Sequence, residues 1–187
     1  MTTQRVWRGR DVFGLLALGW AALAVSAARA ADVTLVAPGA LCRYQVPSSG
    51  ADGTNWTASA FDDSAWSEGA SGIGYDKDGS YAPLFGTTVA NGTIDVYARF
   101  AFTVPAGAIY DSLTLRLKYE DGFIAYLNGT EVARSNAPAS AVYNSVATAN
   151  RSDSLAVVYK DYSLTSFLPK LQTGVNVLAV HLLNCNA

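Results

Sequence analysis

The side chains that could carry out chemistry in this chain of 187 residues are few. His181 is the single histidine, and it shares the face of an apolar, alternating stretch with Val177 and Ala179. A Ser-His-Asp triad would need this histidine, and the Gly-x-Ser-x-Gly turn is absent. Glycoside hydrolysis needs two opposed carboxylates, and no acidic pair stands out by its placement. We therefore interpret His181 as an ordinary sheet residue and predict a protein without catalytic activity.

Metal binding is conceivable at one loop. A single histidine and two distant cysteines match no zinc-ligand spacing. Asp76 and Asp78 alternate in a Gly-containing loop and could offer oxygen ligands to Ca²⁺. The third acidic position and the closing Glu of an EF-hand loop are missing, so a solvated turn is the alternative. Calcium at Asp76 and Asp78 is the one cofactor that the sequence suggests.

Aromatic residues indicate a possible ligand surface. Sugar rings present apolar C–H faces that stack on aromatic rings, while their hydroxyls pair with polar neighbours. Tyr75, Tyr81 and Tyr143 lie in loop-like sequence and could provide such a surface. We expect outward loops to carry the ligand contacts, with Tyr75, Tyr81 and Asp121 as the candidate binding residues. Packing of aromatic side chains in the core is the alternative.

The first 30 residues have the three parts of a secretory signal peptide. Arginines precede an apolar run of 14 residues at 12–25, and a small-x-small cleavage site follows at 28–30. The run is too short for a comfortable membrane span, and an uncleaved anchor is the alternative. We predict that the signal helix of residues 1–30 is removed and that 31–187 form one domain that is secreted, periplasmic or on the cell surface.

Composition excludes several classes of protein. Hydrophobic residues make up 50% and charged residues 15%, which excludes a disordered chain. Signal removal would take four of 13 basic and one of 15 acidic residues, leaving nine against fourteen and a net charge of −5. Such a charge gives no electrostatic reason to bind nucleic acid or anionic lipid. We therefore expect neither a nucleic-acid partner nor a membrane partner after cleavage.

Two cysteines, Cys42 and Cys185, lie near the two ends of the expected domain. An oxidising compartment would permit a disulfide between them. Such a bridge would close a very long loop, which chain-entropy models favour by about 4–5 kcal/mol. Two separate thiols are the alternative, because pairing depends on geometry. Both interpretations stay open at the level of sequence.

Alternation of apolar and polar residues predicts antiparallel strands. Residues 113–120 alternate without a fault, which is typical of a half-buried strand. Within 96–104 the even-numbered residues are apolar and are expected to face inward, with Tyr97 and Arg99 facing outward. Pro105 ends that strand, because proline cannot donate to the ladder.

The remaining elements complete an all-β domain. Asn128-Gly129 predicts a type I′ hairpin between strands at 123–127 and 130–133. The last two strands are expected at 155–164 and 175–183, separated by a short turn or a single helical turn. Short strands without a βαβ pattern indicate an antiparallel β-sandwich, of which a jelly roll is the expected form.

Several motifs together resemble galactose-binding-like jelly-roll modules. The stretch 61–66 (FDDSAW) is similar to one in the sugar-binding domain of family-2 glycoside hydrolases. The set over 33–186 is similar to an accessory β-sandwich of exported bacterial proteins, often found beside lamin-tail or CotH-like domains. The motifs are Asn55-Trp56, 61–66, 72–75, 97–102, 119–122, 126–134 and 176–184.

This resemblance implies a non-catalytic module that binds carbohydrate or supports a larger protein. The alternative is a structural or interaction domain, the N-terminal part of a larger CotH-kinase-like or hydrolytic surface protein. The family pattern continues past Asn184 into another strand. The resemblance therefore implies a module that lacks its last strand and belongs with further domains of a longer parent chain.

Overall fold

The computed structural model describes residues 32–77, 79 and 81–185. The predicted signal peptide at 1–30 and one of the two calcium candidates, Asp78, lie outside these residues. The compact unit begins at Thr34. In the described part of the chain, no helix has the length and apolar character needed to cross a membrane.

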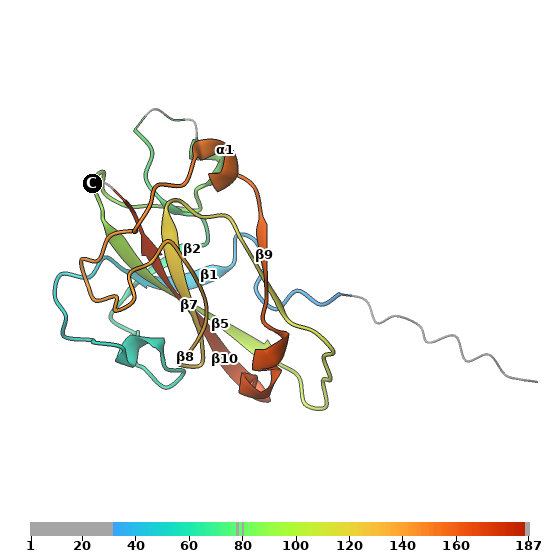
Figure 1. Cartoon of the computed structure of the whole chain (residues 1–187). Coiled ribbons are helices and arrows are strands. Elements are labelled where there is room, and N and C mark those ends of the chain that lie inside the picture. The colour runs from blue at the N-terminus through green and yellow to red at the C-terminus, as the bar shows by residue number, and fades with distance from the viewer. Residues whose placement is uncertain (1–31, 78, 80, 186–187) are drawn as a thin grey trace, which may run out of the picture. The chain divides into compact units, whose positions relative to one another are not determined.

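Most regular structure of the described residues is β, and it confirms the predicted all-β antiparallel sandwich (Figure 1). The main sheet has six strands in the order β2-β1-β5-β10-β7-β8, and every neighbouring pair is antiparallel. These strands are β1 (Leu41–Gln45), β2 (Ser67–Ala70), β5 (Asp95–Val104), β7 (Gly122–Leu127), β8 (Thr130–Ser135) and β10 (Gly174–Leu183).

Shorter elements surround this sheet. Two small sheets pair β3 (Ile73–Gly74) with β4 (Thr87–Thr88) and β6 (Thr114–Leu117) with β9 (Lys160–Ser163). The helical turns are η1 (Asn55–Thr57), η2 (Ala82–Leu84), α1 (Asp153–Ala156) and η3 (Thr165–Lys170).

One face of the main sheet, here called the inner face, contains the larger core. Alternate residues of β5, β7 and β10 point to it, as the period of two predicts. The pair β6–β9 contributes Leu115 and Tyr162 to the same cluster. Buried residues of this face include Ala98, Phe100, Phe123, Ala125, Leu127 and Val180. The inward positions predicted for β5 at 98 and 100 are therefore confirmed.

The opposite face, here called the tryptophan face, is also buried over part of its area. Trp56 and Trp66 pack there on Tyr97, Val177 and Ala179. Tyr97 and Arg99 point away from the larger core, as predicted, but they do not reach solvent. Each is only 3% exposed. The reason is tertiary, because the segment between β1 and β2 folds back over these strands.

The Asn128-Gly129 hairpin is confirmed. Asn128 has φ of 50° and Gly129 has φ of 85°, the positive values that a type I′ turn requires. Leu127 and Thr130 pair directly across the turn. Asn128 also uses its side chain, because Nδ2 donates to Asn176 Oδ1 at 2.8 Å and Oδ1 accepts from the Val177 amide at 2.9 Å. The turn residue thereby ties the hairpin to the central strand β10.

The strand predicted at 155–164 forms only in its second half. Residues 153–156 form α1 instead, and β9 covers 160–163. Ser152 takes an extended conformation before a first turn that contains Asp153, which is typical of a helix start. The turn predicted just before the final strand is confirmed as η3.

The disulfide interpretation is wrong, since Cys42 and Cys185 are both free thiols. Arg43 of β1 is level with Arg99 of β5, which is level with Ala179 of β10. Cys185 lies six residues beyond that level, which corresponds to about 20 Å of extended chain. A disulfide requires Cα atoms within about 7 Å, so the register keeps the two thiols apart. Burial raises the pKa of Cys42 to about 11.

Candidate functional site

Asp121 was predicted to contact ligand from an outward loop, and the structure places it inside the protein. Its side chain is buried. Oδ1 accepts a hydrogen bond from the Arg151 amide at 2.8 Å, and Oδ2 accepts one from the Cys185 amide at 2.7 Å. A carboxylate engaged in this way holds two chain segments together. The prediction for Asp121 is therefore wrong, because burial leaves it inaccessible to a ligand.

Tyr75 and Tyr81 lie near Asp121 and the residues that follow β10. The Tyr75 hydroxyl accepts from Nδ2 of Asn184 at 2.6 Å. The Tyr81 hydroxyl is shielded from solvent, and its pKa is raised, first by burial and then by the nearby Glu120. The structure thus brings these predicted residues together, but in contacts with other residues of the chain.

In the predicted calcium loop, the carboxylate of Asp76 forms a hydrogen bond within the loop. Oδ2 of Asp76 accepts a hydrogen bond from the Tyr81 amide, which closes the 76–81 loop. Among the described residues, no three or more His, Cys, Asp or Glu side chains come together in a way that could hold a metal ion. The structure therefore gives Asp76 a role in the loop itself.

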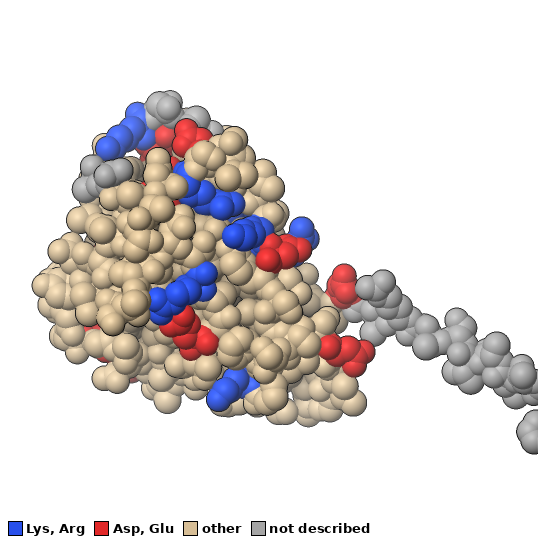
Figure 2. Space-filling model, in the orientation of Figure 1, with Lys and Arg blue, Asp and Glu red and all other residues tan. Residues whose placement is uncertain are grey.

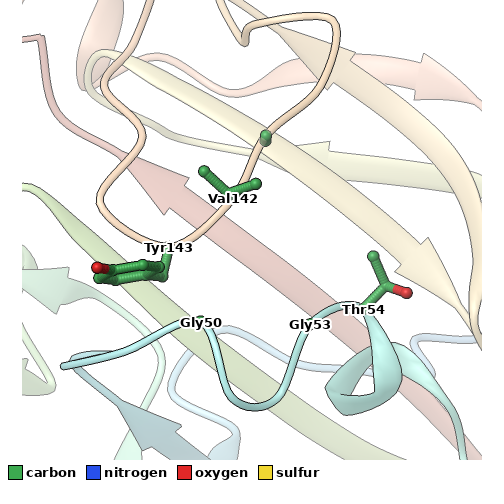
Figure 3. Close-up of a pocket in the computed structure, with 6 residues that line it drawn as sticks. Gly50, Gly53, Thr54, Val142 and Tyr143 are labelled. Atoms are coloured by element: carbon green, nitrogen blue, oxygen red, sulfur yellow. The ribbon is translucent and has the colours of Figure 1, made fainter.

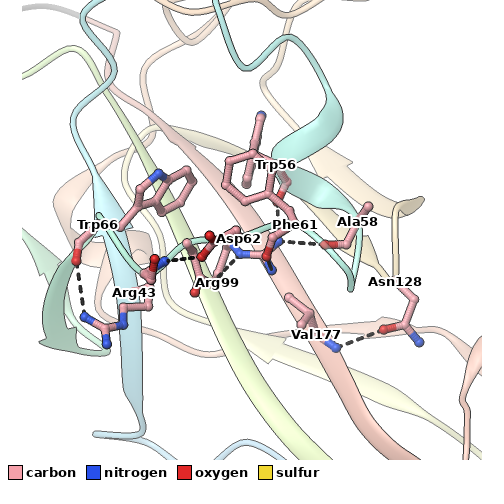
Figure 4. A network of polar contacts seen from close by, with 11 residues as sticks. Arg43, Trp56, Ala58, Phe61, Asp62, Trp66, Arg99, Asn128 and Val177 are labelled. Carbon is pink, nitrogen blue, oxygen red and sulfur yellow. Dashed lines mark hydrogen bonds and ion pairs between the residues drawn. The ribbon is translucent and has the colours of Figure 1, made fainter.

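Arg99 organises the tryptophan face (Figure 4). Its Nε donates to Oδ2 of Asp63 at 2.6 Å, and its side chain is only 2% exposed. The other guanidinium nitrogens donate to the carbonyl oxygens of Trp56, Ala58 and Phe61. One planar cation therefore satisfies four acceptors along the segment that covers the sheet.

Further contacts stabilise the covering segment, which comprises residues 46–66 between β1 and β2. The Trp56 ring stacks on Tyr97 with centroids 4.1 Å apart and planes 7° apart. Asp62 Oδ1 accepts from the Ser64 amide at 3.0 Å, and hydrogen bonds from Ser64 lower the pKa of Asp62. The FDDSAW motif at 61–66 is therefore a folded turn between two buried or partly buried aromatic side chains, and Arg99 binds it to the sheet.

An open pocket of about 530 Å³ lies between the loop after β1 and the loop after β8 (Figure 3). The two loops are far apart in sequence and face each other across it. Tyr143 and Val142 are exposed on one side, at 39% and 64%. The lining residues are Gly50, Gly53, Thr54, Ala141, Val142 and Tyr143.

Glycine at position 50 allows the two loops to approach. A Cβ atom there would lie 3.1 Å from Cδ1 of Tyr143, which is tighter than ordinary van der Waals contact. Gly53 has φ of 50°, in the left-handed region that glycine adopts without strain. The aromatic ring therefore lies against bare backbone, with Thr54 supplying a hydroxyl nearby (Figure 3).

The loop that carries Tyr143 is anchored to the sheet by a buried carboxylate. Oδ2 of Asp95 accepts from the amide of Asn144 at 3.0 Å and lies 3.0 Å from Nε2 of His181. His181 also meets the ring of Tyr97 edge-on, with centroids 4.7 Å apart. The interpretation of His181 as a sheet residue is confirmed. Asp95, which His181 contacts, in turn holds Asn144, the residue next to Tyr143.

Sequence reasoning named Tyr143 among the loop tyrosines but missed the glycines that complete the pocket. Gly50 and Gly53 lie 90 residues or more before it in the chain, so no local pattern links the two loops. The signal that could have found them is the pair of glycines in a Ser-rich and Asp-containing loop between an expected strand and Trp56. Such loops follow an accessible path and offer bare backbone to a neighbour.

Comparison with known proteins gives fold likenesses at low identity. No family model and no curated protein matches this chain. A β-glycosidase from Bacteroides vulgatus aligns at 16% identity and a TM-score of 0.47, over 80% of this chain and 17% of that chain. A Bacteroides uniformis β-glucuronidase aligns at 20% and 0.49, over 79% and 14%. A Ruminococcus gnavus β-glucuronidase aligns at 13% and 0.46, over 78% and 20%. This chain thus spans a fifth or less of the length of these enzymes.

Proposed function

We propose that this chain is an exported, non-catalytic module that binds carbohydrate in the pocket between the 46–54 and 136–152 loops. The observation that carries the proposal is the exposed Tyr143 ring lying against Gly50 at the edge of an open cavity. An aromatic ring of this kind offers an apolar face to the C–H groups of a sugar. Backbone groups and the Thr54 hydroxyl are available to the sugar hydroxyls.

The sequence supports the same proposal in two ways. The tripartite pattern of residues 1–30 supports export. The motif set that resembles galactose-binding-like modules supports a sugar-related role, and the rarity of candidate catalytic groups supports binding without turnover.

The test is a substitution that removes the ring. Tyr143→Ala should weaken binding to any glycan recognised on a broad array by about tenfold, because a stacked ring contributes about 1–1.5 kcal/mol. Tyr143→Phe should retain most of the affinity, because the stacking face remains. Titration calorimetry would measure both.

Tyr159→Ala is the matched control. Tyr159 is similarly exposed, at 42%, but it follows α1 in the chain and so lies outside the 136–152 loop. It should leave glycan affinity within about twofold. Equal losses in Tyr143→Ala and Tyr159→Ala would contradict the proposed site. Binding that survives Tyr143→Ala unchanged would do the same.

A structural or interaction domain of a larger surface protein is the second candidate. A run of exposed apolar residues that begins in α1 and continues after it favours it, because contiguous apolar surface is typical of docking sites. These residues are Leu155, Val157, Val158 and Tyr159. A folded, monodisperse chain that binds no member of a broad glycan array would favour this function over the first.

A further inference from the structure

The residues that line the Tyr143 pocket are all uncharged, and two carboxylates are close to them in sequence or contact. No lysine or arginine is among the residues that line it. Asp52 lies between the two lining glycines, and Asp95 accepts a hydrogen bond from the residue after Tyr143. Among the described residues, neither carboxylate forms an ion pair with a lysine or arginine, and Asp95 faces the His181 imidazole within the core.

Arg134 contacts the loop that carries Tyr143, and its charge is already paired. Its guanidinium forms two hydrogen bonds to the carboxylate of Glu131, at 2.5 and 2.6 Å. Its remaining donor, Nη1, reaches the carbonyl oxygens of Pro138 and Ala139, just before the lining residue Ala141. A bidentate ion pair of this geometry leaves little positive charge to offer a ligand.

The two carboxylates also lie close enough to Tyr97 to influence its pKa. The pKa of Tyr97 is raised to about 12, first by burial and then by the charges of Asp95 and Asp52. Both carboxylates therefore act on one common side chain, Tyr97. A negatively charged ligand would meet the same kind of repulsion, and none of the residues that line the pocket is a cation that could offset the loss of its hydration.

We infer that the pocket selects neutral sugar residues and disfavours uronic acids. The inference rests on the proposed function and gives its substrate class. A neutral ring needs an apolar face and hydroxyl partners, both of which the lining provides. A uronate carboxylate in the pocket would be repelled by both acids, and at a dielectric intermediate between protein and water this repulsion should weaken its binding roughly tenfold.

Matched oligosaccharide pairs test this inference directly. Cello-oligosaccharides and β-1,4-glucuronan oligomers of the same length differ only at C6, as do α-1,4-galactan and oligogalacturonate oligomers. These pairs are added to a broad array of neutral and uronate glycans probed with the purified chain. We expect neutral members to bind at least about tenfold more tightly than their uronate counterparts, with little dependence on salt.

A charge-reversal variant sharpens the result. Asp52→Lys should raise the affinity for uronate members by about tenfold or more at low salt and should lose that gain at high salt. Asp111→Lys, at an exposed position in the β5–β6 connection, is the control and should leave the ratio unchanged. Because both variants add the same charge, a difference between them reports position rather than net charge.

The possible outcomes separate the two proposals. Uronates that bind the wild-type chain as well as or better than neutral sugars, with binding lost in Tyr143→Ala, would overturn the selectivity and leave the proposed function standing. Absence of binding to every array member by a folded chain would overturn both. An Asp52→Lys ratio equal to that of Asp111→Lys would remove Asp52 from the explanation and overturn the electrostatic argument.

Discussion

The two faces of the six-stranded sheet are buried by different physical means. The inner face is closed by side chains of β6, β9 and the loops beside them, in a mainly apolar cluster. The tryptophan face is closed by an irregular segment whose carbonyl oxygens are collected by one buried arginine, Arg99. Hydrophobic burial is non-directional and tolerant of small shifts, whereas the arginine contacts depend on exact geometry. We therefore expect the tryptophan face to unfold locally under milder conditions than the inner face.

The largest expected effect is on the inner face. Phe123 is fully buried and meets Tyr119 and Tyr162 edge-on, at centroid distances of 4.8 and 5.2 Å. Phe123→Ala should lower the free energy of unfolding by about 3–5 kcal/mol, because it removes apolar contacts and leaves a cavity. Urea denaturation followed by circular dichroism would measure it. Ile109→Ala, at an 89% exposed position, should change stability by less than about 0.5 kcal/mol. Similar losses in both variants would contradict the assignment of the core.

A smaller and more local effect is expected on the tryptophan face. Arg99→Met should cost about 2–4 kcal/mol, because Asp63 and the carbonyl oxygens of the covering segment lose their donor. Trp56 and Trp66 are the two tryptophans after residue 30, so their fluorescence reports on this face. We expect it to shift to the red at lower urea concentration than the loss of β-sheet signal.

Arg116→Met is the matched control for that variant. Arg116 and Asp161 form an ion pair at 2.8 Å, but their side chains are 65% and 59% exposed. Exposed pairs contribute about 0–1 kcal/mol, so the variant should remain close to the wild type and keep coincident transitions. Coincident fluorescence and circular dichroism transitions in Arg99→Met would show that the two faces unfold as one unit.

The smallest expected effect concerns alkaline pH. Because the pKa of Tyr97 is about 12 in the folded protein and about 10 in an unfolded chain, its contribution to stability is complete below pH 10 and is lost as the pH rises toward 12. Between pH 8 and 11 this loss is about 1–1.5 kcal/mol. Tyr97→Phe should therefore show a shallower alkaline decline of unfolding free energy by that amount. A decline in Tyr97→Phe as steep as in wild type would exclude Tyr97 as its source.

The sheet and its inner face could be predicted from local patterns. Period-two alternation identified β5, β6 and β10, and Asn128-Gly129 identified the hairpin, because these signals depend on neighbours in the chain. The residues predicted for ligand binding could be placed in loops in the same way. Their burial could not, since the Asp121 carboxylate is removed from solvent by amides 30 and 64 residues away.

The sequence by itself determined the fold class, the hairpin, the central strands and the short turn before β10, all of which follow from backbone and side-chain preferences over a few residues. Only the tertiary structure decided that Arg99 and Tyr97 are interior, that the cysteines are apart and that Gly50 meets Tyr143. Each of these depends on how segments distant in sequence pack together. Packing of that kind is set by the whole fold, because no local preference specifies which distant surface a polar side chain or a glycine will meet.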